Sequence, residues 1–85
     1  MEERTADEIA AIFAAAGDSV TAIGGDKREG QTDAEWKEEL QRNVDHLELI
    51  KAYKKVDGTT SIWGSENFTA QDAAVTSGKS KIAAL

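Results

Sequence analysis

The single histidine, His46, is the side chain in this 85-residue chain best suited to acid–base chemistry near neutral pH. On a helix, its neighbours at spacings of three and four residues are Arg42, Asn43, Leu49 and Ile50. None of these is a carboxylate that could orient the imidazole ring. We therefore expect His46 to pack at the edge of the core or in a subunit contact, and not to act in catalysis.

Carboxylates are numerous, but their spacing does not predict a catalytic pair. Most of them follow the polar face of one predicted helix, at Glu35, Glu38, Glu39, Asp45 and Glu48. Such a face is usually solvated. The i,i+4 pair that Glu38 and Arg42 form on it adds only a few tenths of a kcal/mol to the stability of the helix. A glycosidase needs two carboxylates facing each other across a cleft, which a chain this short can hardly build. The sequence therefore predicts no catalytic residue.

Two further segments resemble binding loops but lack the residues that such loops require. Residues 78–80 read Gly-Lys-Ser, as in a phosphate-binding loop, but Ala73 stands where the first glycine must be. A calcium loop beginning at Asp57 would need glycine and glutamate where Ile62 and Phe68 stand. The chain has no cysteine, which excludes a zinc site with thiolate ligands. We therefore predict no metal site, no cofactor, no small-molecule substrate and no enzymatic activity.

Charge and size limit the classes of partner. The net charge of -6 argues against binding to nucleic acid. Residues 1–48 carry 13 acidic and 5 basic side chains, a charge of -8, whereas residues 49–85 carry 3 and 5, a charge of +2. An acidic half joined to a mildly basic half could dock onto copies of itself. A small acidic regulator that binds a host protein, or mimics DNA, is the alternative that this asymmetry leaves open.

The sequence predicts neither a membrane segment nor a secretory signal. No stretch approaches the roughly 18 consecutive apolar residues of a membrane span, and the opening residues 1–4 are acidic. We expect synthesis in the cytoplasm. With one small core and no disulfide, support from oligomerisation or from a larger assembly is expected.

Three threonines, each three residues before an acid, predict helix starts at Thr5, Thr32 and Thr69. After the first start, a short helix is expected to end at Gly17. Its apolar face consists of Ile9, Ile12, Phe13 and Ala16. The following residues, 20–23, could form another helical turn or an extended connection.

The second helix is predicted from Asp33 to about Tyr53. Its apolar stripe consists of Trp36, Leu40, Val44, Leu47 and Ile50. Leu49, Ala52 and Tyr53 widen the apolar area near its C-terminal end, which predicts contact with more than one neighbour.

Asp57-Gly58 lies between two runs that contain strand-forming residues, a pattern typical of a β-hairpin turn. A short helix is predicted from about Ala70 to Ser77, ended by Gly78. The expected fold class is mainly α (α+β): short helix, long amphipathic helix, β-hairpin and short C-terminal helix. We expect one domain over residues 1–85, in which residues 79–85 form a tail that can be extended.

Aromatic and aliphatic residues outside the predicted stripe are the candidates for contact with other proteins. Trp36 is assigned to the core, whereas for Trp63 core and interface are both left open. The predicted interface residues are Tyr53, Val56, Ile62, Trp63, Phe68, Ile82 and Leu85.

Residues 43–82 resemble the C-terminal half of small proteins encoded by tailed bacteriophages and prophages. The resemblance is carried by residues 43–47 and 68–70, by Gly78-Lys79 and above all by residues 55–63, Lys-Val-Asp-Gly-Thr-Thr-Ser-Ile-Trp. Gly64 and Asn67 depart from the pattern. The resemblance implies a virion component, such as a head-decoration, connector or tail-associated subunit, whose partners are other virion proteins or copies of itself. It implies no particular site residues.

Overall fold

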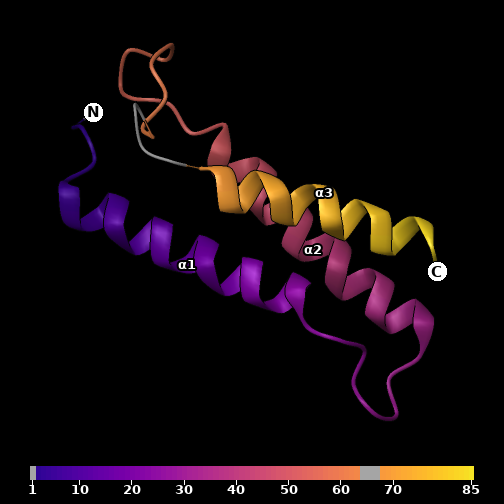
Figure 1. Cartoon of the computed structure of the whole chain (residues 1–85). Helices are drawn as coiled ribbons and strands as arrows, with labels where there is room; N and C mark the ends of the chain where they lie inside the picture. Colours follow the sequence, from indigo (N-terminus) through magenta and orange to yellow (C-terminus); the bar gives the residue numbers. More distant parts are fainter. Residues whose placement is uncertain (1, 64–67) are drawn as a thin grey trace.

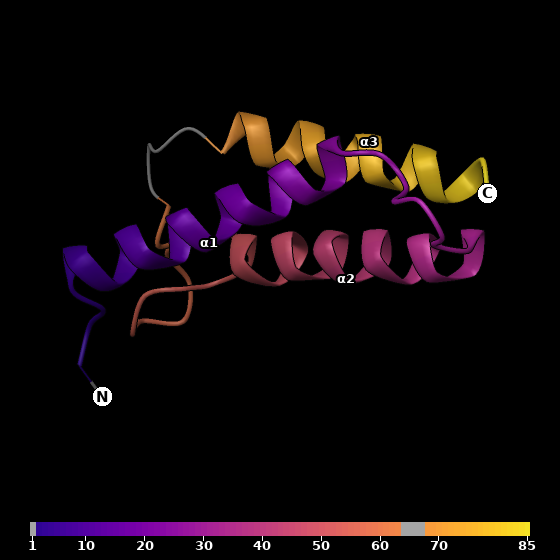
Figure 2. The ribbon, with the colours of Figure 1, turned by 90° about the horizontal axis from the view of Figure 1, so that it is seen from below.

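The computed structural model describes residues 2–63 and 68–85, and these contain three α-helices. The helices are α1 (Ala6–Gly24), α2 (Asp33–Lys51) and α3 (Thr69–Ala83). Figures 1 and 2 show that α1 and α3 run in the same direction while α2 runs opposite to both. Each helix packs against the other two. The result is an elongated up-down-up bundle that measures 45 × 21 × 20 Å.

The first two helices begin with the capping boxes that the sequence predicts. The Thr5 hydroxyl accepts a hydrogen bond from the Glu8 backbone N–H (3.1 Å), and the Glu8 carboxylate accepts one from the Thr5 N–H (2.9 Å). Thr32 and Glu35 repeat both contacts at 3.1 and 3.0 Å. Because these N–H groups stabilise the ionised carboxylates, the pKa values of Glu8 and Glu35 lie below their ordinary value of 4.5.

The stripe predicted for the second helix is confirmed, because all five of its large apolar side chains are buried. They face buried residues of α1, of α3 and of the segment that joins α2 to α3. These partners are Ala16 and Ile23 of α1, Ala74 of α3, and Ile62, Trp63 and Phe68 of the joining segment. The helix ends at Lys51, two residues before the predicted Tyr53.

The predicted end of the first helix at Gly17 is wrong, because α1 continues to Gly24. The added turns bury Ser19 and Ile23 against the core. This burial outweighs the helix-weakening effect of one glycine, which is about 1 kcal/mol.

The predicted stop of the last helix at Gly78 is also wrong, because α3 runs on to Ala83. Gly78 is buried, and a Cβ atom placed on it would lie 2.6 Å from Cγ2 of Val44 and 3.4 Å from Cγ2 of Ile23. The glycine therefore allows α3 to approach α1 and α2 closely. Residues 79–83, where an extended tail was expected, belong to this helix.

The start of that helix also differs from the expected cap. Phe68, and not Thr69, occupies the N-cap position, and Thr69 is the first helical residue. The third Thr-x-x-acid pattern therefore does not form the capping box seen at Thr5 and Thr32.

The predicted β-hairpin at Asp57-Gly58 is wrong, because no strand occurs in residues 2–63 or 68–85. A loop closed by a single antiparallel bridge between Lys54 and Ser61 takes its place. Its turn is centred one residue earlier than expected, since the Lys55 carbonyl accepts a hydrogen bond from the Gly58 N–H (2.9 Å). The Asp57 carboxylate then accepts the next two backbone N–H groups, so that they do not join a strand ladder.

The residues after this loop explain why a second strand does not form. Ile62 and Trp63 are adjacent, yet both are buried in the helical core. Successive side chains of a strand point to opposite faces, so a strand here would turn one of them away from α2.

Candidate functional site

An open apolar groove of about 420 Å³ lies between the N-terminal half of α1 and the segment before α3. Its lining residues are Ala6, Ile9, Ala10, Phe13, Ile62 and Trp63. The Trp63 ring is held in place because its Nε1–H donates a buried hydrogen bond to the Ile50 carbonyl (2.7 Å) and its centroid lies 5.0 Å from that of Phe68. One wall of the groove is therefore fixed by the core itself.

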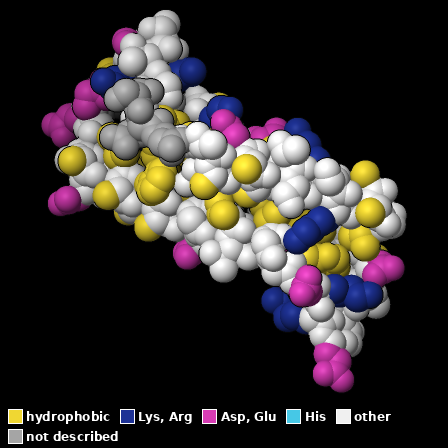
Figure 3. Space-filling model, in the orientation of Figure 1, with side chains coloured by type: hydrophobic (Ala, Val, Ile, Leu, Met, Phe, Trp, Pro, Cys, Tyr) yellow, Lys and Arg dark blue, Asp and Glu magenta, His cyan; other side chains and the backbone are white. Residues whose placement is uncertain are grey.

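The α1 side of the groove is apolar yet open to solvent. Phe13 remains 41 % exposed although its ring centroid lies only 5.8 Å from that of Trp63. From Ile9 to Gly17 the helix carries no charged residue in nine positions. In the space-filling view, hydrophobic side chains gather on this face along the N-terminal half of α1 (Figure 3). A surface helix normally carries polar residues on its outer side, so this face has the composition of a contact surface.

Acidic residues stand at both ends of the uncharged run. Asp7 and Glu8 precede it, Asp18 follows it, and all three are exposed. None of the three forms an ion pair with another described residue. Residues 5–25 contain no lysine or arginine, so all the charged side chains that α1 itself carries are acidic.

The seven predicted interface residues do not form one patch. Ile62, Trp63 and Phe68 are buried, and the first two line the groove. Tyr53 is half-buried beneath the Arg4 guanidinium, which lies 4.8 Å from the ring centroid.

The other three predicted residues lie at opposite ends of the bundle. Val56 is exposed in the loop after α2. Half-buried Ile82 and exposed Leu85 lie near the C-terminus, at the opposite end of the bundle (Figure 1).

The α1 half of the groove is not among the sites predicted from the sequence. Ile9 and Phe13 were expected on the core face, and Ala6 and Ala10 had no predicted role. The sequence feature that indicates it is the uncharged run of residues 9–17. This run leaves more of the helix surface without charge than one buried stripe requires.

His46 forms a contact between helices. Its Nδ1 atom lies 2.7 Å from the hydroxyl oxygen of Ser19, which links α2 to α1. Ser19 is only 4 % exposed, and no carboxylate of the described chain hydrogen-bonds to the imidazole. A nucleophile needs access to substrate and a base held by a third group, and this pair has neither. The contact fits the packing role expected for His46.

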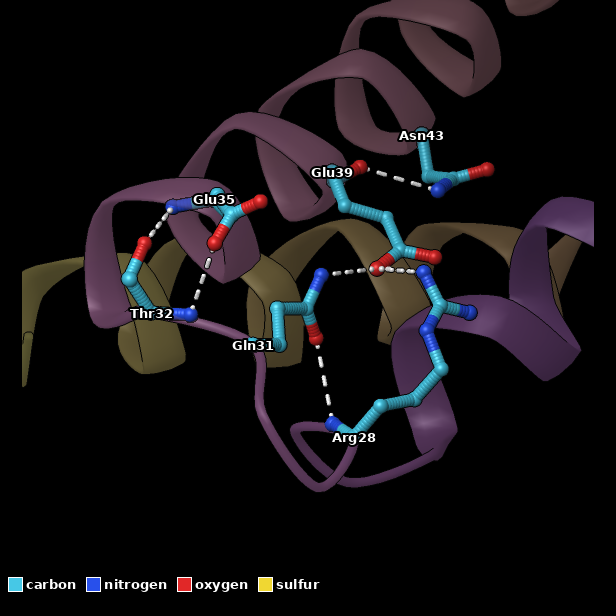
Figure 4. Close-up of polar contacts among 6 residues, drawn as sticks. All are labelled: Arg28, Gln31, Thr32, Glu35, Glu39 and Asn43. Atoms are coloured by element: carbon cyan, nitrogen blue, oxygen red, sulfur yellow. Dashed lines mark hydrogen bonds and ion pairs between the residues drawn. The ribbon is translucent and has the colours of Figure 1, made fainter.

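A polar network joins the loop before α2 to that helix (Figure 4). The Glu39 carboxylate accepts hydrogen bonds from the side chains of Gln31 (3.0 Å) and Arg28 (2.9 Å). Hydrogen bonding from Gln31, with the nearby Arg28 charge, holds the pKa of Glu39 below its ordinary value. Asn43 donates to the Glu39 carbonyl one turn further along (2.9 Å). Because every member is engaged with another, the network stabilises the loop and does not resemble a binding site.

Two other kinds of site are absent from the part of the chain that the structure describes. No three side chains of the types His, Asp or Glu gather there in a way that could hold a metal ion. The helices there also lack the combination of length and apolar character that crossing a bilayer requires.

No protein-family model, curated protein or solved structure matches this chain. The resemblance of residues 43–82 to phage proteins therefore stays a prediction. The candidate site is defined by geometry alone, and the apolar groove is its main feature.

Proposed function

We propose that this chain is a non-enzymatic structural or assembly subunit of a phage particle, such as a head-decoration, connector or tail-associated protein. The observation that carries a protein-binding role is the open apolar groove beside α1, with Phe13 left 41 % exposed. The resemblance of residues 43–82 supports the phage setting. In this proposal the chain is made in the host cytoplasm, is incorporated into the virion, and contacts other virion proteins or copies of itself.

The energetics of the groove favour a protein partner. Burying the exposed part of Phe13 would alone contribute roughly 1 kcal/mol. The fixed Trp63 ring means that little side-chain freedom is lost when a partner binds. The lining side chains are all apolar, whereas small-molecule sites combine apolar walls with a few convergent polar groups. Nucleic acid and membrane surfaces are no part of the proposal, because both present phosphates to a protein of net charge -6.

The test is co-purification with phage particles. A C-terminally tagged chain should band with particles in a density gradient at a fixed copy number. The substitution Phe13→Ser should remove it from the particles. Leu49→Ser is the matched control, because Leu49 is 59 % exposed on α2 and does not line the groove. The proposal fails if the pure protein stays monomeric by light scattering at high concentration and also does not bind particles.

The alternative function is that of a small acidic regulator bound to a host protein. The absence of any basic residue from Thr5 to Gly25 favours it, because that helix presents only negative charge. A stoichiometric host enzyme recovered in a pull-down, together with particles that lack the chain, would favour this alternative over the virion role.

A further inference from the structure

We propose that Asp57 is a site of spontaneous covalent modification, which the folded loop of residues 54–61 protects and which converts to isoaspartate through a succinimide when that loop opens. The reaction needs no enzyme and no reactant other than water. It is independent of the virion role, because Asp57 does not line the apolar groove. It follows from the way the loop holds both of the groups that must react.

Asp57-Gly58 is the pair of residues in this chain best suited to such a reaction. A glycine after the aspartate leaves the attacking backbone nitrogen without a side chain beside it, so ring closure meets little steric hindrance. No other Asp-Gly or Asn-Gly pair occurs in the sequence. Both residues are exposed, in a loop that projects beyond the C-terminal end of α2 (Figure 1), and water therefore reaches them.

The reaction joins the Gly58 backbone nitrogen to the side-chain carbon Cγ of Asp57. The nitrogen loses its proton, the protonated carboxyl group loses its hydroxyl, and the two leave as a water molecule. A second water molecule then opens the imide ring. Opening at the backbone carbonyl carbon of Asp57 gives isoaspartate, whereas opening at Cγ restores aspartate. The overall change is an isomerisation without change of mass.

The folded loop holds the attacking nitrogen in a hydrogen bond. The Gly58 N–H donates to the Lys55 carbonyl (2.9 Å), inside the bridge that joins Lys54 to Ser61. Because the nitrogen loses its proton when it bonds to Cγ, this hydrogen bond must break before the ring can form. The turn therefore opposes the first step.

The loop also keeps the Asp57 carboxyl group in its unreactive form. One oxygen accepts hydrogen bonds from the backbone N–H groups of Thr59 and Thr60 (2.8 Å each), and the other accepts one from the Thr60 hydroxyl (2.6 Å). These donors stabilise the ionised form and lower the pKa from 3.8 to about 2. The protonated form is the one that reacts, because its hydroxyl can leave as water. At any pH above 3.8 the lower pKa reduces the protonated fraction by more than tenfold.

The product cannot rebuild the loop. Isoaspartate lengthens the main chain by a methylene group and carries its free carboxylate on the α-carbon. The carboxylate oxygens then no longer lie where the donors of Thr59 and Thr60 hold them. The modification therefore makes an opening of this loop irreversible.

The experiment incubates the full chain in weakly acidic buffer, both folded and in concentrated urea, and follows the formation of isoaspartate with time. A methyltransferase specific for isoaspartate labels the product, and electron-transfer fragmentation of the tryptic peptide of residues 56–79 locates it. The unfolded chain should form isoaspartate at Asp57 at least about tenfold faster than the folded chain. Equal rates in the two states would overturn the proposal. So would an unfolded chain that forms no isoaspartate at Asp57.

Variants assign the protection to the Thr60 hydroxyl. Thr60→Val keeps the shape of the side chain but removes the donor, and should speed the reaction in the folded chain about three- to tenfold. Thr60→Ser keeps the donor and should react at the wild-type rate. Thr76→Val is the matched control and should also react at that rate, because Thr76 is exposed and its hydroxyl donates to the Asp72 carbonyl (3.2 Å) on α3.

The unfolded state separates an effect of the loop from an effect of sequence. In concentrated urea the wild-type chain and the Thr60→Val variant should react at the same rate, because the loop contacts are then absent. Circular dichroism checks that each variant keeps its helices in buffer. Equal rates of folded Thr60→Val and folded Thr60→Ser would overturn the protective role of the hydroxyl. The comparison of folded with unfolded wild-type chain decides the proposal even if a variant does not fold.

Discussion

The ammonium group of Lys81 donates hydrogen bonds to the carbonyl oxygens of Ile23 (2.5 Å) and Gly25 (3.1 Å), so α3 supplies the positive charge that the last turn of α1 lacks in its own sequence. The last turn of α1 contains no basic residue, and its unpaired carbonyls carry partial negative charge. A lysine 58 positions away therefore stabilises the end of the first helix.

Replacing Lys81 with methionine should keep the apolar stem of the side chain and remove the cap. We expect the free energy of unfolding to fall by about 1 kcal/mol. Urea denaturation followed by circular dichroism measures the change. Lys37→Met is the control at an exposed position of α2 and should change stability by less than about 0.5 kcal/mol. Equal effects of the two substitutions would contradict the capping role.

Substituting Gly78 with alanine should destabilise the bundle, because the new Cβ would lie 2.6 Å from Cγ2 of Val44. We expect a net loss of about 1–2 kcal/mol after the gain in helix propensity. Gly17→Ala is the matched control inside α1. A Cβ added there would meet no atom within 4 Å, so this substitution should stabilise by about 0.5–1 kcal/mol. Thermal denaturation distinguishes the two signs.

Gln71 is only 4 % exposed, and its Oε1 atom has no hydrogen-bond partner in residues 2–63 and 68–85. Because a buried acceptor without a donor costs about 1–3 kcal/mol, Gln71→Met should stabilise the protein by about 1 kcal/mol. Gln31→Met should do the opposite, since Gln31 bonds to both Glu39 and Arg28. A loss of stability on Gln71→Met would mean that the amide group has a stabilising partner.

The loop after α2 should respond to acid through Asp57. Hydrogen bonds from the Thr60 hydroxyl and from the backbone N–H groups of Thr60 and Thr59 lower the pKa of Asp57 from 3.8 to about 2. A lowered folded-state pKa means that the stabilisation is complete above pH 3.8 and is lost as the pH falls through about 2. An NMR titration of the Asp57 carboxyl carbon should give a midpoint near 2. Thr60→Val should raise that midpoint, and an unchanged midpoint would contradict the assignment.

The sequence predicted correctly those features that depend on neighbouring residues. The capping boxes at Thr5 and Thr32 need only a hydroxyl and a glutamate three positions apart, and both are present. The stripe of α2 could be read because its buried side chains repeat at helical spacing.

The errors concern residues whose roles depend on distant parts of the chain. Gly78 reads as a helix stop in isolation, but it is required by Val44 and Ile23 on two other helices. Asp57-Gly58 favours a hairpin locally, yet the burial of Ile62 and Trp63 against helices excludes the second strand.

The groove was missed for the same reason. Phe13 fits a core pattern by its spacing, and only the three-dimensional arrangement shows that it remains 41 % exposed. The part of the site formed by Trp63 could be anticipated, since the sequence left both core and interface open for it. The structure gives that residue a buried ring that also lines the groove.

The link between Lys81 and Ile23 also bears on the order of folding. The antiparallel pairs of neighbouring helices close shorter spans of chain, whereas the contact of α1 with α3 closes a span of 58 residues. Docking of the first helix on the last should therefore follow the rate-limiting step. Stopped-flow kinetics of Lys81→Met should show faster unfolding with an almost unchanged refolding rate.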